Sequence, residues 1–182
     1  MKTLILSIYF LYYATAVYED ISPAPANFKE VMLEQHNNYR KLLAEGKVPG
    51  APVPKSMPAL IWDENLVKSA AHYVEKCIPK HDTYADRKTA PYEYTGQNLY
   101  AGPKIQDALM WMFNEYKYYD YGKNTCIPGK ICGHYTQLMW AESTHVGCAY
   151  KNCTSGTFPY GWLVICNYGP AGNFEGEKPY EI

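Results

Sequence analysis

The chain has 182 residues, enough for one domain with a hydrophobic core of its own. Its 17 basic and 18 acidic residues give a net charge near zero and no long basic run, which excludes the electrostatic footprint of a nucleic-acid-binding protein. The tyrosine count of 19 is unusual, but tyrosine serves both cores and amphipathic binding surfaces, so the count alone does not choose between them.

The N-terminus has the three parts of a secretory signal peptide. A short basic segment (residues 1–3) precedes an apolar stretch (4–13) that is short for a membrane span, and Ala-Thr-Ala at 14–16 forms a small-x-small cleavage site. We therefore expect residues 1–16 to be removed, leaving residues 17–182 as a single secreted domain. No later segment approaches the ~18 to 20 apolar residues of a membrane helix, so we expect no transmembrane segment.

Apolar residues recur at helical spacing in the first part of the mature chain. Asn27 and Glu30 resemble a capping box, and the stripe behind them is Phe28, Val31, Met32, His36, Tyr39, Leu42 and Leu43. Gly46 ends this predicted helix. After a proline-rich loop, Asp63 is placed to cap a second helix, whose apolar stripe is Leu66, Ala70, Val74 and Cys77.

The pattern changes in the second half of the chain. Residues 78–104 contain several proline and glycine breakers and are predicted to be irregular. A third helix is predicted over 105–119, stopped by Gly122, and a short fourth one over 135–140. Residues 145–151 and 160–168 are predicted to be two strands joined by a polar turn with Gly156. Helices flanking a small antiparallel sheet indicate one α+β domain, an α-β-α sandwich.

Six cysteines in an exported chain form an even set, and the oxidising compartment favours their pairing. Neither Cys126-x5-Cys132 nor Cys148-x4-Cys153 has the CxxC spacing of a zinc ribbon or a thioredoxin. Structural disulfides are therefore expected. Cysteine spacing alone leaves their connectivity open.

Several segments resemble signatures of the CAP superfamily, which includes cysteine-rich secretory proteins, insect venom antigen 5 and plant pathogenesis-related class 1 proteins. The two most specific segments are GHYTQLMWAESTHVGCAY (133–150) and LVICNYGPAGNF (163–174). Further matches are HNNYR (36–40), GQNLYAG (96–102), YDY (119–121) and the Cys126/Cys132 pair. The resemblance covers essentially the whole mature chain, looks most like the venom allergen-like proteins of parasitic worms such as schistosomes, and implies the same α-β-α sandwich.

The resemblance also chooses among the possible disulfides. Matching the cysteines in order implies the pairs Cys77–Cys153, Cys126–Cys132 and Cys148–Cys166. The last of these would join the two predicted strands.

The family has a central cleft lined by two histidines and two glutamates, which holds a divalent metal in some members. The resemblance assigns His81 and His134 as the histidines and Glu115 as one glutamate, whereas Gln97 stands where the family usually has the second. Two imidazoles and one carboxylate can still hold Zn²⁺, but an amide is a poor zinc ligand. We therefore expect a polar hydrogen-bonded pocket or weak Zn²⁺ binding, with no required cofactor.

No enzymatic motif accompanies this cleft. Neither HExxH nor GxSxG occurs in the chain. An amide cannot accept a proton as a base, so Glu115 would have to serve as a metal ligand or as a base, and could not do both. We expect that the protein is not an enzyme, which makes a metal-dependent hydrolase the least favoured function.

Two apolar regions are candidates for lipid binding. Sterol-binding family members use a loop of pattern aromatic-x-aromatic-x4-aromatic, whose first two positions Tyr119 and Tyr121 fit here. The candidate sterol-binding residues are these two and their neighbours Tyr116 and Tyr118. Cys126 takes the last aromatic position of that pattern. Some members hold a fatty acid between helices, for which the candidates on the first helix are Met32, Tyr39 and Leu43. The alternative for both sets is that the side chains fill the core.

Three function classes follow. The first is a secreted protein that binds sterol or fatty acid, and the second is an interaction protein that acts on host extracellular proteins. The third is the disfavoured hydrolase. The chain ends soon after Asn173 without the Cys-rich tail of channel-blocking relatives, so we do not expect that activity. Asn152-Cys153-Thr154 is formally a glycosylation sequon at Asn152.

Overall fold

The computed structural model describes residues 23–154 and 158–182, so the expected signal peptide (1–16) and the turn at Gly156 lie outside the described residues. The helices are α2 (Phe28–Ala44), α3 (Glu64–Val74), α4 (Tyr84–Arg87), α5 (Ala108–Asn114) and α6 (Gly133–Leu138). Short 3-10 helices, Ile105–Asp107 and Glu115–Tyr118, extend α5 at its two ends. The strands are β1 (Ile61–Trp62), β2 (Gly96–Gly102), β3 (Tyr119–Asp120), β4 (Thr125–Cys126), β5 (His145–Asn152) and β6 (Trp162–Gly169).

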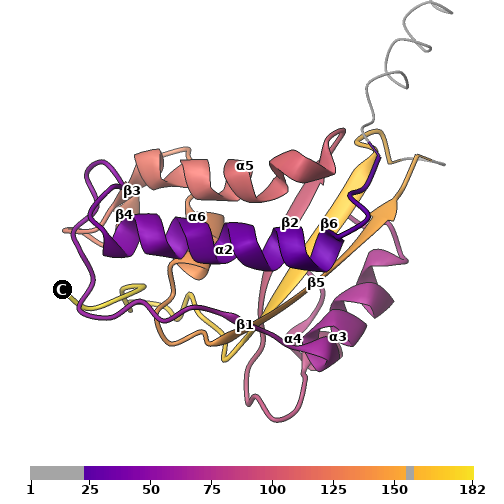
Figure 1. Ribbon diagram of the computed structural model, residues 1–182, viewed down its shortest axis with the longest axis horizontal. Coiled ribbons are helices and arrows are strands. Elements are labelled where there is room, and N and C mark those ends of the chain that lie inside the picture. Colours follow the sequence, from indigo (N-terminus) through magenta and orange to yellow (C-terminus); the bar gives the residue numbers. More distant parts are fainter. Residues whose placement is uncertain (1–22, 155–157) are drawn as a thin grey trace, which may run out of the picture.

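One mixed sheet with strand order β1-β5-β6-β2 lies between two layers of helices (Figure 1). α3 packs on β5 and β6 from one side, and α2, α5 and α6 lie on the other. Each face buries its own hydrophobic cluster, with Val74 and Ile165 on the α3 side and Leu109 and Leu138 on the opposite side. This is the predicted α-β-α sandwich, and the fold class is confirmed.

The sheet contains the two predicted strands and one that was not predicted. β5 and β6 pair antiparallel, with Cys148 opposite Cys166. β2 pairs antiparallel with β6 along its whole length, so the prediction that residues 96–102 are irregular is wrong. Glycines at both ends concealed this strand. A Cβ atom at Gly96 would lie 2.3 Å from Oε1 of Gln137 and 3.3 Å from the backbone nitrogen of Gly172, so the Gln137 amide would have to move to admit a larger residue.

The helix ends show which predicted caps form. Asp63 caps α3, since its side chain accepts hydrogen bonds from the N–H groups of Asn65 (2.7 Å) and Leu66 (3.2 Å). The capping box at Asn27 is wrong, because Asn27 precedes α2 without a side-chain cap. The predicted third helix forms as α5 with its 3-10 extensions, and the fourth lies two residues earlier than predicted, at Gly133–Leu138.

Arg40 is a buried cation that fastens α2 to a distant segment. Its side chain is 1% exposed, and the guanidinium donates to the backbone carbonyls of Pro58, Leu138, Trp140, Ala141 and Ser143. Burial lowers the pKa of Arg40 to about 10. The loop that follows α6 is thus held by hydrogen bonds to one side chain of α2.

Three disulfides join the pairs that the resemblance implied. Cys148–Cys166 links β5 to β6, and Cys77–Cys153 ties the segment after α3 to the end of β5. Cys126–Cys132 closes a short loop between β4 and α6. No cysteine of the described residues is free.

Candidate functional site

Glu115 and His134 form one half of the expected cleft. Glu115 starts the 3-10 helix after α5, and His134 lies in the first turn of α6, where backbone N–H groups have no partner within the helix. One Glu115 oxygen accepts from the N–H groups of His134 (3.0 Å) and Tyr135 (3.3 Å). The other lies 2.7 Å from Nδ1 of His134. Both carboxylate oxygens are therefore in use, and Glu115 caps α6 from outside the helix.

His81 and Gln97 form a second, separate pair. Nδ1 of His81 lies 2.9 Å from Oε1 of Gln97, and Nε2 of Gln97 donates to Oδ1 of Asn167 on β6 at 3.1 Å. The Asn167 amide nitrogen in turn donates to Ser69 of α3. This chain of hydrogen bonds orients Gln97 toward the α3 side of the sheet.

The pleat of β2 separates the two pairs. Gln97 and Asn98 are consecutive in this strand, so their side chains point to opposite faces of the sheet. Asn98 is the residue that reaches the other pair, because its amide donates to the backbone carbonyl of His134 at 2.9 Å. Sequence reasoning missed Asn98, although it stands next to Gln97 in the same motif.

The candidate zinc ligands do not converge. Within residues 23–154 and 158–182, the atoms of His81, His134 and Glu115 are not grouped within 4.8 Å of one another. As arranged, these side chains do not fit a Zn²⁺ ion, which needs at least three protein donors around one point. What the geometry supports at these positions is a polar, hydrogen-bonded pocket.

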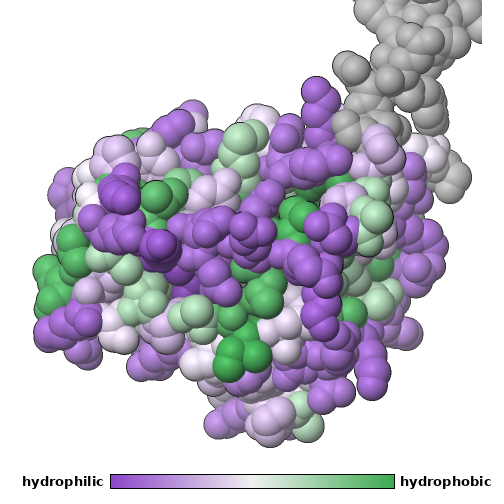
Figure 2. Space-filling model, viewed as in Figure 1, coloured by the Kyte–Doolittle hydropathy of each residue, from purple (hydrophilic) through white to green (hydrophobic). Residues whose placement is uncertain are grey.

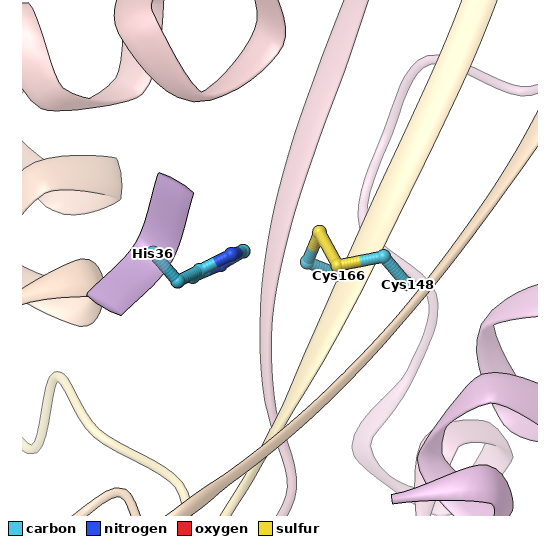
Figure 3. Close-up of side chains that lie close together, drawn as sticks. All are labelled: His36, Cys148 and Cys166. Carbon is cyan, nitrogen blue, oxygen red and sulfur yellow. A yellow bond between two sulfur atoms is a disulfide. The ribbon is translucent and has the colours of Figure 1, made fainter. Parts of the chain in front are cut away.

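A different trio does meet that distance, namely His36 with Cys148 and Cys166 (Figure 3). The two sulfurs are joined in a disulfide, so neither is a thiolate that could bind a metal. Both ring nitrogens of His36 are also engaged, one with the carbonyl of Met32 (2.7 Å) and one with the hydroxyl of Tyr168 (2.9 Å). This trio is a packed part of the core.

A cleft of about 590 Å³ opens beside His81 and Gln97. Three aromatic side chains stand at its edge with much of their surface exposed, namely Tyr84 (71%), Tyr94 (51%) and Phe174 (39%). Tyr84 lies over the buried guanidinium of Arg87, whose central carbon is 4.3 Å from the ring centre. The cleft thus combines a polar floor with an aromatic rim.

The candidate sterol tyrosines lie in the 3-10 helix Glu115–Tyr118 and in the β3–β4 hairpin that follows it, and they differ in burial. Tyr121 belongs to the core: it is 8% exposed, its hydroxyl donates to the carbonyl of Tyr180 at 2.6 Å, and the two rings stack. Tyr119 is half-buried, and its hydroxyl donates to Asn124 at 2.6 Å. Tyr116 and Tyr118 are half-buried as well. Burial raises the pKa of Tyr119, which keeps its phenol neutral.

Tyr119 stands between two hollows. The smaller, about 150 Å³, is enclosed by Tyr116, Tyr119, Tyr121 and Tyr135 with the loop at Pro49 to Ala51. The larger, about 340 Å³, is a groove whose aromatic walls are Tyr119, Trp140 and Phe174 and whose polar edge includes Asn124, Thr136 and Asn173. Sequence reasoning missed Trp140 and Phe174, because only the fold brings them beside the hairpin.

The residues proposed for a fatty-acid channel are packed. Met32 and Leu43 are 2% and 0% exposed in the cluster beneath α2 and α5. The Tyr39 ring stacks on Phe113 of α5 with centroids 4.1 Å apart, which fills the space between the two helices. A fatty acid would have to displace this stack.

Two further features concern the surface. Asn152 ends β5 with its side chain exposed, and its Oδ1 accepts from the N–H of Thr154 at 3.2 Å. Across residues 23–154 and 158–182, no helix has the length and apolar character needed to cross a bilayer.

Comparison of the sequence with known proteins finds one matching family model and several individual relatives. Residues 33–168 match the CAP model, described as the Cysteine-rich secretory protein family. GLIPR1-like protein 1 of Homo sapiens is 35% identical over 161 residues, which are 85% of this chain but only 63% of that protein. Scoloptoxin SSD552 of Scolopendra dehaani is 33% identical over 164 residues, 86% of this chain and 75% of the toxin.

Solved structures agree with these sequence matches. Venom allergen-like protein 4 of Schistosoma mansoni superimposes with a TM-score of 0.75 at 30% identity, covering 84% of this chain and 92% of that one. NaASP2, solved with Zn²⁺, gives a TM-score of 0.70 at 25% identity, covering 87% and 90%.

Proposed function

Since the chain belongs to the cysteine-rich secretory protein (CAP) family, we propose that it is an extracellular protein that binds a small lipid, a sterol first, and has no catalytic role. Its disulfides and its similarity to a scoloptoxin support an extracellular location. The engagement of both Glu115 oxygens at the start of α6 supports the absence of a free general base.

The groove beside Tyr119 is the observation that carries the lipid proposal. Its volume of about 340 Å³ falls at the lower end of the ~300 to 1,000 Å³ typical of small-molecule sites. A sterol is a rigid apolar plate with one hydroxyl. Tyr119, Trp140 and Phe174 offer flat apolar walls for the plate, and the polar edge offers partners for the hydroxyl.

Burial, hydrogen bonding and position relative to the groove support different roles for the candidate tyrosines. Tyr121 does not line the 340 Å³ groove and is committed to Tyr180, so we assign it to support of the hairpin. Tyr119 is the member of the set that lines the groove. A sterol is favoured over a fatty acid, because Tyr39 and Phe113 fill the space where the fatty acid would lie.

Equilibrium binding of radiolabelled cholesterol to the purified secreted protein tests this proposal. We expect saturable binding by the wild type and an affinity at least about tenfold lower in Tyr119→Ala or Phe174→Ala, because each variant removes one apolar wall. Tyr118→Ala is the matched control, since Tyr118 does not line the groove. Wild-type protein that fails to bind, or folded Tyr119→Ala and Phe174→Ala variants that bind normally, would contradict it.

A second candidate is supported by the aromatic rim of the 590 Å³ cleft. Exposed tyrosines are enriched at protein interfaces, and Tyr84, Tyr94 and Phe174 stand together around one concave site. This arrangement favours an interaction with a host extracellular protein or peptide. Cross-linking of the secreted protein to host tissue fluid, compared with Tyr84→Ala/Tyr94→Ala, tests it; a partner captured equally by both forms would exclude this cleft as its site.

A further inference from the structure

The loop closed by Cys126–Cys132 exposes an unusual cluster of aliphatic side chains. All five residues inside it, 127–131, are exposed, with Ile127 at 49% and Ile131 at 65%. Pro128 stands between them, so the loop has an apolar surface at its tip. Figure 2 shows hydrophobic residues (green) at the left edge of the molecule, the end at which Figure 1 draws the β3–β4 hairpin.

The backbone holds this loop in one shape. The N–H of Ile127 donates to the carbonyl of Tyr118 at 2.8 Å, which continues the pairing of β3 with β4. The N–H of Lys130 donates to the carbonyl of Ile127 at 3.0 Å, with Pro128 and then Gly129 (φ +76°) between them, as in a type II turn. A Cβ added at Gly129 would meet nothing within 4 Å, so the tip projects into solvent.

The segment that carries the loop has a net positive charge, although Glu177 also lines the neighbouring 340 Å³ groove. Residues 116–132 contain three lysines, at 117, 123 and 130, and one acidic residue, Asp120, although the whole chain carries a net charge of −1. Asp120 is paired with Lys123 at 3.3 Å. Lys117 and Lys130 are exposed and neither forms an ion pair with another described residue.

We propose that the Cys126–Cys132 loop docks the protein on anionic lipid bilayers, with Ile127 and Ile131 inserted at the boundary between headgroups and acyl chains. Partial insertion of apolar side chains and attraction of lysines to anionic lipid act together in reversible membrane binding. The fixed shape of the loop favours docking, because little conformational entropy is lost when it inserts.

This inference extends the proposed lipid-binding function. Membrane docking itself does not depend on that function, but its purpose, the uptake of a sterol, rests on it. The loop leads from β4 to α6, and both Cys126 and Cys132 line the 340 Å³ groove. A sterol leaving the bilayer at the docked loop would therefore reach the groove without crossing open water.

Sedimentation with vesicles that contain no sterol tests the docking separately from cholesterol binding. The probes are phosphatidylcholine vesicles with and without about a quarter of phosphatidylserine, at low and high salt. We expect wild-type protein to bind the anionic vesicles, with binding weakened by salt, and Ile127→Ser/Ile131→Ser to bind at least about tenfold more weakly. Cholesterol delivered in detergent should still bind this variant as it binds wild type.

Val53→Ser/Ile61→Ser is the matched control, because it removes two aliphatic side chains of similar exposure (53% and 60%) outside this loop. The control should bind vesicles like wild type. The proposal is overturned if wild type does not bind anionic vesicles, or if the loop variant and the control behave alike. It is also overturned if the loop variant only dissolves a dimer of the free protein, which would make a second copy the occupant.

Discussion

Glu115 contacts His134 twice, through the backbone N–H at 3.0 Å and through Nδ1 at 2.7 Å. The carboxylate that the family resemblance assigns to a metal cleft is thus a helix cap in this chain. An external cap of this kind satisfies N–H groups at the start of α6 that have no partner within the helix.

Replacing Glu115 should therefore affect stability before any binding property. Glu115→Ala leaves the N–H groups of His134 and Tyr135 without their acceptor, and we expect the free energy of unfolding to fall by about 1 to 3 kcal/mol. Glu115→Gln keeps an acceptor oxygen and should cost less. Urea unfolding measures both, with exposed Glu93→Ala as the control. A Glu115→Ala protein as stable as wild type would show that water replaces the cap at no cost.

Zinc affinity should depend on the residue at position 97. We expect at most weak Zn²⁺ binding by wild type, because its candidate ligands do not converge, and tighter binding by Gln97→Glu, because the new carboxylate would place a second donor beside His81 where Oε1 of Gln97 now lies. Neither form should hydrolyse esters or peptides. Calorimetric titration checks the affinity, and adding His81→Ala to Gln97→Glu should abolish the gain. Tight binding by wild type, unchanged in Gln97→Glu, would refute the role assigned to this position.

The free energy of unfolding should decrease as the pH is lowered, because of His36. Burial lowers the pKa of His36 from 6.5 to about 4 in the folded protein. Between these values the unfolded chain binds a proton that the folded protein does not, so acidification from pH 6.5 toward 4 favours unfolding, by up to about 3 kcal/mol. Below about pH 4 this contribution should stop growing.

The measurement is urea unfolding of His36→Phe and wild type across this pH range. The variant should show a flatter dependence, whereas His72→Phe, at an exposed position, should follow wild type. If His36→Phe loses stability on acidification as steeply as wild type, the dependence arises elsewhere.

Substitutions of Tyr121 and of Tyr119 should have different effects. Those of Tyr121 should lower stability, whereas Tyr119→Ala should lower the affinity for cholesterol. Tyr121→Ala empties a core position and removes the hydrogen bond to Tyr180, so we expect it to lower the free energy of unfolding by about 3 to 5 kcal/mol. Tyr121→Phe keeps the ring and should lose only about 1 kcal/mol. Thermal unfolding monitors both variants. Should Tyr121→Phe fold normally yet lose cholesterol binding, Tyr121 would be a binding residue after all.

The sequence by itself determined the features that neighbouring residues control. Asp63 was recognised as a cap because its hydrogen-bond partners lie two and three residues away. The runs that became β5 and β6 were also recognised from their own residues, as was the helical spacing along α2. The family resemblance, which is also read from sequence, supplied the disulfide pairs.

Only the tertiary structure decided which polar and aromatic groups meet. The pleat of β2 directs Gln97 away from His134 and Asn98 toward it, and β2 itself exists because β6 supplies its hydrogen-bond partners. Arg40 stood in a recognised motif, yet its carbonyl partners lie up to 103 residues away. Tyr119 lines a groove while Tyr121 fills the core, although they are two positions apart. These outcomes depend on the burial and pairing of distant segments, which local sequence patterns do not contain.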